Sequence, residues 1–178
     1  MARLFLIDGS NQMYRAYHAI RGLTGPDGKS TNAVYGFTTM LKKLVADHRP
    51  EYIAASFDLK GPTFRSEMAA DYKANRSPMP PDLSEQIPWV HEACEALGVP
   101  ILTFERFEAD DVIGTLSRQA AGAGFVVAIV SGDKDFFLLV CGPVAASDTD
   151  AVAHFKKDVQ PLLAQYCHDC HADGACAL

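Results

Sequence analysis

The sequence predicts an α/β fold in which a central, mainly parallel sheet lies between two layers of helices. Three observations lead to this prediction. Short apolar runs alternate with helical patterns, glycine or proline marks several helix ends, and acidic residues follow the apolar runs. Such alternation is typical of a parallel, three-layer domain. At 178 residues, the chain is long enough for one domain of this kind and a short appendage.

Four apolar runs are expected to form the strands. Each is about six residues long and is bounded by polar or turn-forming residues, which is the pattern of a buried strand. The expected strands are Arg3–Asp8, Tyr52–Phe57, Val99–Phe104 and Phe125–Val130.

Helices are expected between and after these strands. Apolar residues recur at helical spacing in the first of them, and Pro88 suits the first position of the second, which Gly98 ends. The expected helices are Thr31–Asp47, Pro88–Leu97, Ala109–Ala121 and one starting within Asp135–Val140.

Seven carboxylates either follow an expected strand or open the helix after one. In an open α/β sheet, ligands bind at the carboxyl ends of the strands. So many negative charges repel one another at close range unless cations neutralise them. The sequence therefore predicts a multi-metal site. Its expected ligands are Asp8, Asp58, Glu108, Asp110, Asp111, Asp133 and Asp135.

The donor types indicate which metal to expect. The set contains only carboxylate oxygens, which Mg²⁺ and Mn²⁺ prefer, and it has no neighbouring His or Cys that would favour zinc. Two such ions about 4 Å apart can hold both the attacking and the leaving oxygen of a phosphodiester. We therefore expect two Mg²⁺ or Mn²⁺ ions and phosphodiester hydrolysis.

A purely structural interpretation of these carboxylates is the alternative. Asp after a strand often caps the next helix, and acidic residues favour first helical turns. That explains any single member about as well as metal binding does, but not all seven at one edge. The adjacent pair Asp110 and Asp111 is the hardest to explain by structure alone.

The net charge and the hydropathy of the chain limit which kinds of partner are expected. The net charge of −6 at first argues against a nucleic-acid partner. Without the seven clustered carboxylates, however, the rest of the chain is close to neutral. No apolar run approaches the roughly 20 residues of a membrane helix, and Asp8 interrupts any signal-like start. We expect a cytoplasmic protein with no membrane contact.

A long connection, Leu59–Pro81, separates the second expected strand from the next helix. Connections beyond about 12–15 residues are usually functional or mobile. This one combines basic and aromatic side chains above the acidic edge. They are Lys60, Phe64, Arg65, Tyr72, Lys73 and Arg76.

Four stretches of the chain resemble a known family. They read LIDGSNQMYRAYHAI, ASFDLKGPTFRSEMAADYKANRSPMP, ERFEADDVIGTL and VSGDKDFFLLV. Together they resemble the 5′-3′ exonuclease domain of bacterial DNA polymerase I, within the PIN-like flap endonuclease group. The resemblance covers about residues 1–140. It implies a metal-dependent 5′ nuclease that cuts DNA at 5′ ends or flaps, including RNA primer–DNA hybrids, in replication and repair.

The resemblance also implies roles for individual residues. The seven carboxylates match the metal ligands of the family, and the segment about 59–81 matches an arch through which a 5′ end passes. Lys73 and Arg76 match basic residues that contact the phosphate near the cut, and Tyr72 matches a residue that stacks on a displaced base. A solvated loop face is the structural alternative for Lys73 and Arg76.

Three further residues are candidates for substrate contact. Arg65 lies in the arch-like segment, and Tyr14 and Arg15 lie close to the first carboxylate. Tyr14 has a structural alternative, which is to pack beneath the site. Gly9 and Gly132 are interpreted as structural, because small residues are needed beside the carboxylates.

After Val140 the sequence departs from the family pattern. The next strand, two further aspartates and a helix-hairpin-helix module are not recognisable. We therefore expect an exonuclease domain over residues 1–144, truncated before that module, and a linker with a tail over residues 145–178. A DNA-binding fragment that does not cleave is the alternative function.

The tail carries a separate motif. Cys167, Cys170 and His171 form C-x-x-C-H, the attachment pattern of c-type haem, and the segment resembles the start of a cytochrome c domain. Roughly 25 residues are too few to enclose a haem, so we expect none and favour a joined reading frame. A redox role, a zinc site that adds Cys176, and a disordered tail are the alternatives.

Overall fold

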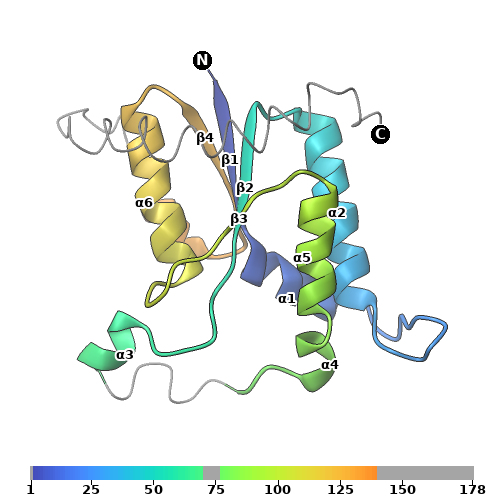
Figure 1. Cartoon of the computed structure of the whole chain (residues 1–178). Coiled ribbons are helices and arrows are strands. Elements are labelled where there is room, and N and C mark those ends of the chain that lie inside the picture. Colours follow the sequence, from blue (N-terminus) through green and yellow to red (C-terminus); the bar gives the residue numbers. More distant parts are fainter. Residues whose placement is uncertain (1, 70–76, 140–178) are drawn as a thin grey trace.

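The computed structural model describes residues 2–69 and 77–139, and its centre is a four-stranded sheet (Figure 1). The strands are all parallel and lie in the order β3-β2-β1-β4. Leu4 of β1 lies opposite Tyr52 of β2 and Val127 of β4. The strands are β1 (Arg3–Asp8), β2 (Tyr52–Ser56), β3 (Ile101–Leu102) and β4 (Val126–Val130).

Helices cover both faces of this sheet, as Figure 1 shows. One face carries α6, while α1, α2 and α5 lie against the other. The helices are α1 (Gly9–Ala19), α2 (Asn32–His48), α3 (Phe64–Met68), α4 (Pro81–Ser84), α5 (Ile87–Ala96), α6 (Ala109–Gly122) and the 3₁₀ helix η1 (Lys134–Leu139). The expected α/β, three-layer, parallel architecture is confirmed.

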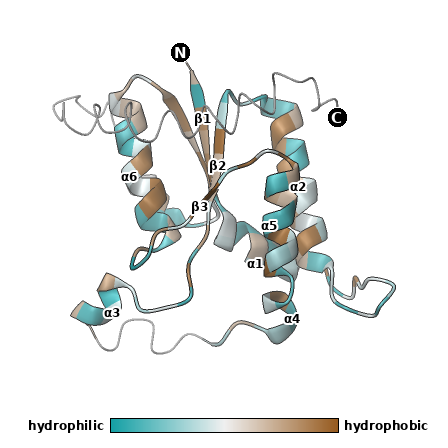
Figure 2. Ribbon diagram, viewed as in Figure 1, coloured by the Kyte–Doolittle hydropathy of each residue, from teal (hydrophilic) through white to brown (hydrophobic). Residues whose placement is uncertain are grey.

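Side-chain alternation along β1 explains the two cores. Leu4 and Leu6 belong to the cluster with α6, whereas Phe5 and Ile7 belong to the cluster with α2. Successive side chains of a strand point to opposite faces, so an uninterrupted apolar strand fills both layers. The strands and the inward faces of the helices are accordingly the most hydrophobic parts of the ribbon in Figure 2.

Three elements differ from the sequence-based expectation. The strand expected over Val99–Phe104 contains only Ile101 and Leu102, because this edge strand pairs with β2 at just two positions. The helix expected to start within Asp135–Val140 is a 3₁₀ helix. Helix α1 was not predicted, since its first residues, Gly-Ser-Asn, are typical of turns.

A buried amide joins α4 and α5 to the start of α2. Gln86 is fully buried, and its Oε1 accepts from the backbone amides of Ala33 (2.9 Å) and Val34 (3.2 Å). Its Nε2 donates to the side chain of Asn32 and to the carbonyl of Asp82, both at 3.0 Å. The side chain thereby satisfies amides that the first turn of a helix leaves unpaired.

Several predictions fall outside the described residues. These are the roles of Tyr72, Lys73 and Arg76, the linker and tail from residue 145 onward, and the motif of Cys167, Cys170 and His171. Within residues 2–69 and 77–139, no helix is long and apolar enough to span a membrane.

Candidate functional site

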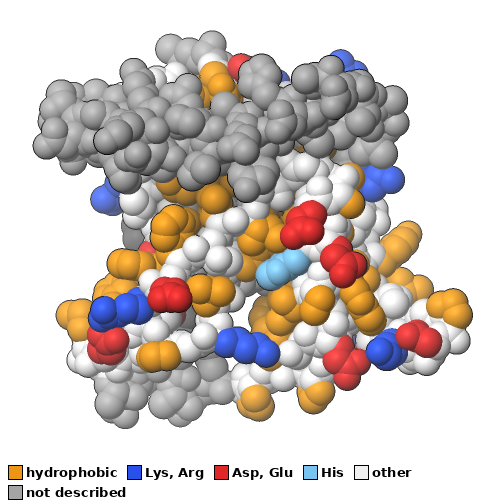
Figure 3. Space-filling view, in the orientation of Figure 1, with side chains coloured by type: hydrophobic (Ala, Val, Ile, Leu, Met, Phe, Trp, Pro, Cys, Tyr) orange, Lys and Arg blue, Asp and Glu red, His pale blue; other side chains and the backbone are white. Residues whose placement is uncertain are grey.

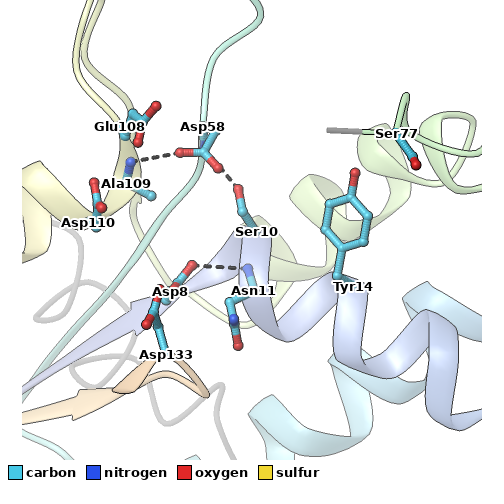
Figure 4. Close-up of a pocket in the computed structure, with 10 residues that line it drawn as sticks. All are labelled: Asp8, Ser10, Asn11, Tyr14, Asp58, Ser77, Glu108, Ala109, Asp110 and Asp133. Atoms are coloured by element: carbon cyan, nitrogen blue, oxygen red, sulfur yellow. Dashed lines mark hydrogen bonds between the residues drawn. The ribbon is translucent and has the colours of Figure 1, made fainter. Parts of the chain in front are cut away.

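A pocket of about 330 Å³ lies at the carboxyl ends of the strands (Figure 4). Asp8 ends β1, Asp58 follows β2, and Asp133 follows β4, while Glu108 and Asp110 stand at the start of α6. All five line the pocket, so four separate strand-to-helix connections contribute carboxylates to one cavity. The full lining is Asp8, Ser10, Asn11, Tyr14, Asp58, Ser77, Glu108, Ala109, Asp110 and Asp133.

Asp8, like Glu108, is a buried carboxylate of this pocket. It caps α1 by accepting from the backbone amide of Asn11 at 3.0 Å, and it accepts from the hydroxyl of Ser131 at 2.8 Å. Burial raises the pKa of Asp8 above its ordinary value, and the negative charges of Asp58 and Asp110 raise it further. The side chain is therefore held in place by neutral donors that do not fully offset its charge.

Hydrogen bonds that involve serine hydroxyls and backbone amides position the neighbouring aspartates. Asp58 accepts from the amide of Ala109 at 2.8 Å, which joins the end of β2 to the start of α6. The amide of Asp58 in turn donates to Ser10 Oγ at 2.9 Å. On the other side, Ser131 Oγ accepts from the amide of Asp133 at 3.0 Å.

At the start of α6, three carboxylates meet one arginine. Arg65, from α3, holds Asp111 in a bidentate pair with N–O distances of 2.6 and 2.5 Å. The same guanidinium lies 3.3 Å from Glu108 and 3.7 Å from Asp110. The pKa of Asp110 is nevertheless raised, first by burial and then by the charge of Asp111.

Close packing beside the site excludes a larger side chain at Gly9 and leaves little room for one at Gly132. A Cβ on Gly9 would lie 2.4 Å from the ring of Phe57, so α1 could not start where it does with any other residue. A Cβ on Gly132 would lie 3.0 Å from both Arg15 and Asn11. The expected structural role of both glycines follows from these contacts.

The remaining candidates for substrate contact lie near the pocket in different ways. Tyr14 is half-buried, lines the pocket and also packs against the main core, so contact with a ligand and structural packing are compatible. Arg15 is exposed and lies beside Gly132. Arg65 is held by the carboxylates of α6.

The structure brings together five of the seven expected metal ligands. Asp111 is paired with Arg65 and is not part of the pocket lining, and Asp135 is exposed in η1, where its amide donates to Asp133. Asp8 and Glu108 each cap a helix and also line the cavity. The structural role considered for these carboxylates is therefore compatible with a place in the pocket.

Sequence reasoning missed the small polar residues that organise the carboxylates. Ser10, Asn11 and Ser77 line the pocket, and Ser131 joins Asp8 to Asp133. A usable signal was present for three of them, since Ser10, Asn11 and Ser131 lie within three residues of a strand-end aspartate.

The carboxylates do not form a closed chelating set in this conformation. Among the described residues, no three acidic, histidine or cysteine side chains converge enough to hold one ion. Two of the charges at the α6 end are instead engaged by the guanidinium of Arg65.

Fold and site together define a parallel α/β domain with an acidic pocket at the carboxyl ends of its strands. Residues 3–164 match the family model described as "5′-3′ exonuclease, N-terminal resolvase-like domain". The chain belongs to this family.

Relatives and solved structures agree with this assignment. DNA polymerase I of Pseudomonas aeruginosa is 49% identical over 148 residues, which is 83% of this chain and 16% of that protein. DNA polymerase I of Bacillus subtilis is 40% identical over 157 residues, 88% of this chain and 17% of that protein. The chain thus spans about a sixth of the length of these curated relatives.

A solved structure shares the fold. The T5 D15 protein, co-crystallised with metal ions, superposes with a TM-score of 0.59 at 20% identity. The match covers 75% of this chain and 50% of that protein. A second crystal structure, of the T5 D15 flap endonuclease with DNA and metal ions, gives a TM-score of 0.57 at 21% identity, covering 75% of this chain and 50% of that one.

Proposed function

We propose that this domain hydrolyses phosphodiester bonds of DNA at 5′ ends or flaps, with two Mg²⁺ or Mn²⁺ ions as cofactors. The observation that carries the proposal is the single pocket in which four strand-to-helix connections place five carboxylates. Membership of the 5′-3′ exonuclease family supports the same activity. The DNA polymerase I relatives favour a role in replication and repair, on flaps or on RNA primer–DNA hybrids.

The chemistry of the pocket fits a hard divalent cation. Its charged donors are all carboxylates, with no His or Cys in the lining. Burial raises the pKa values of Asp8 and Asp110, and neighbouring negative charges raise them further, which a bound cation would oppose. When bound, such ions would polarise a phosphodiester and activate a water molecule.

The residues of the pocket would divide the remaining work. Asp8, Asp58 and Glu108 are anchored at strand or helix ends, so they would hold the ions at a fixed edge of the sheet. Asp110 and Asp133 are exposed, line the pocket and would complete the ligand set. Tyr14 and Arg15, on α1, would contact a substrate that enters there.

Residues beyond the described part of the chain complete the proposal. Lys73 and Arg76 would offset the charge that builds on the cleaved phosphate, because positioned cations stabilise such transition states. Tyr72 would stack on a base without reading its identity, which suits an enzyme that recognises DNA structure.

A cleavage assay with a 5′-labelled flap duplex tests this function. The full chain should release labelled product in Mg²⁺ or Mn²⁺ and none in EDTA, and Asp110→Asn should abolish release while leaving the circular dichroism spectrum unchanged. Equal activity in the variant would refute the assignment of the site.

A second candidate is DNA binding without cleavage. It is favoured by the finding that, within the described residues, no three acidic side chains are grouped tightly enough to hold one ion. Retention of flap DNA without turnover in either metal would support this candidate over the first.

A further inference from the structure

Helix α3 lies at the surface of the domain and contacts it through polar groups and one aromatic ring. None of its five residues is buried. It lies against the loop that connects β3 to α6, immediately before Glu108 (Figure 1). In the space-filling view, basic, acidic and hydrophobic side chains alternate at the lower left, where α3 lies (Figure 3).

Three contacts tie α3 to this loop independently of the pocket. The amide of Phe64 donates to the carbonyl of Arg106 at 3.0 Å. The rings of Phe64 and Phe107 pack with centroids 5.6 Å apart. Arg106 also forms an ion pair with Glu67, and both side chains of this pair are more than half exposed. Exposed pairs of this kind contribute little stability, about 0–1 kcal/mol.

The fourth contact reaches the pocket itself. Arg65 is less than a third exposed and engages Asp111 through two nitrogens, with Glu108 at 3.3 Å. The second oxygen of Asp111 also accepts from the amide of Glu108 at 3.1 Å. Both oxygens of Asp111 therefore accept hydrogen bonds, and the guanidinium lies beside the carboxylates at the start of α6.

We propose that Arg65 and α3 form an ion-operated clasp, in which the guanidinium and a divalent cation compete for Glu108 and Asp111. When the ion binds, α3 loses the hold of Arg65, and its attachment to the loop between β3 and α6 is weakened. The inference rests on the proposed function, because it takes the pocket to be the place where divalent ions bind.

The competition arises because the guanidinium of Arg65 and a divalent ion would both bind the carboxylate oxygens of Glu108 and Asp111. Asp111 already accepts three hydrogen bonds, two from Arg65 and one from the amide of Glu108, so an ion bound there would share its oxygens with the guanidinium and be repelled by that positive charge. Linkage is reciprocal, so whatever weakens the clasp must strengthen ion binding by the same factor. Helix α3 ends two residues before the segment 70–76, which carries Lys73 and Arg76, so the clasp would couple metal loading to the base of that segment.

The first measurement is Mn²⁺ binding by calorimetry on the full chain. Arg65→Gln should bind Mn²⁺ about fivefold or more tightly than the wild type, in line with the usual range of coupling energies. Arg118→Gln removes the same charge from an exposed position on α6 and should bind Mn²⁺ like the wild type. Equal or weaker binding by Arg65→Gln than by Arg118→Gln would overturn the clasp.

The second measurement is amide hydrogen exchange over residues 63–69, with and without Mn²⁺. In the wild type, Mn²⁺ should accelerate exchange at Phe64, whose amide is bonded to Arg106. Glu67→Gln leaves Arg65 and the pocket unchanged but loosens α3, so it should raise both the exchange rate and Mn²⁺ affinity. Exchange that does not respond to Mn²⁺ would also overturn the clasp.

These outcomes separate the clasp from the proposed function. If the wild type binds Mn²⁺, Asp110→Asn loses it and Arg65→Gln matches the wild type, the clasp is wrong and the nuclease site stands. If the wild type takes up no Mn²⁺, both ideas fail together.

Discussion

The helices on either side of residues 70–76, α3 and α4, are attached to the domain in opposite ways. Helix α3 has no buried side chain and depends on the ion pairs of Arg65 and Arg106. Helix α4 buries Leu83 completely and leads into Gln86, whose amide is fully buried and hydrogen-bonded at both ends. The two ends of one long connection thus rest on different kinds of interaction.

This difference indicates which of the two helices, α3 or α4, can respond to a change of charge in the acidic pocket. Ion pairs with partly exposed members are weak and depend on the charges around them. A buried, fully satisfied amide is costly to disturb and insensitive to distant charge. We therefore expect α4 and α5 to stay fixed while α3 changes its attachment with the occupancy of the pocket.

The largest expected effect concerns the acidic pocket at the carboxyl ends of the strands. Asp110→Asn should lower cleavage of a 5′-flap duplex by about 100-fold or more, because it removes a charge that would stabilise the reacting centre. Rates under saturating Mn²⁺ provide the measurement. Asp47→Asn, an exposed change near the end of α2, serves as the control and should leave the rate unchanged.

The substitution Gln86→Ala tests whether the buried amide anchors α4 and α5. The change leaves the amides of Ala33 and Val34 without their acceptor and should lower the free energy of unfolding by about 2 kcal/mol. Urea denaturation of this variant and of Gln119→Ala, on the surface side of α6, gives the comparison. A loss no greater than that of Gln119→Ala would mean that the buried amide does not anchor this end.

The substitution Phe64→Ala tests whether α3 is weakly attached to the domain. Loss of the ring contact with Phe107 should cost about 1 kcal/mol or less in global stability. Amide exchange within α3 should nevertheless rise, because none of its residues is buried. Protection of α3 that survives the change would contradict its weak attachment.

The loop beneath α3 contains a residue in a strained conformation. Arg106 has φ of 69°, a left-handed value that glycine adopts without penalty. Arg106→Gly should therefore be more stable than Arg106→Ala by about 1 kcal/mol, although both lose the ion pair with Glu67. Thermal unfolding of the two variants decides this, and equal melting temperatures would argue against strain.

The smallest effect should be the pH dependence of Asp8→Asn. Burial raises the pKa of Asp8 above its ordinary 3.8, so the folded state holds the proton more tightly than the unfolded state does. Stability of the wild type is then lost as pH rises above 3.8, whereas the variant lacks this loss. In EDTA, the stability of the variant relative to the wild type should increase from pH 3.5 to pH 7, and a constant difference would contradict the shift.

Local patterns were sufficient to predict most of the framework. The apolar runs of β1, β2 and β4 and the periodicity of α2, α5 and α6 are each contained in short stretches of chain, and the observed elements match them within a few residues. The strand-end positions of Asp8, Asp58 and Asp133 follow from the same patterns. Edge strand β3 was overestimated because pairing depends on a neighbour that the local sequence does not reveal.

The sequence alone determined the parallel architecture and the edge of the sheet where acidic side chains gather, because hydrophobic periodicity and strand ends are local properties. Only the tertiary structure decided which carboxylates share the pocket and which are engaged elsewhere. Arg65 and Asp111 are separated by 46 positions in the chain, and no spacing rule predicts that they form a bidentate pair. Contacts of this kind arise when packing brings distant loops together, and they determine how charge is distributed around the site.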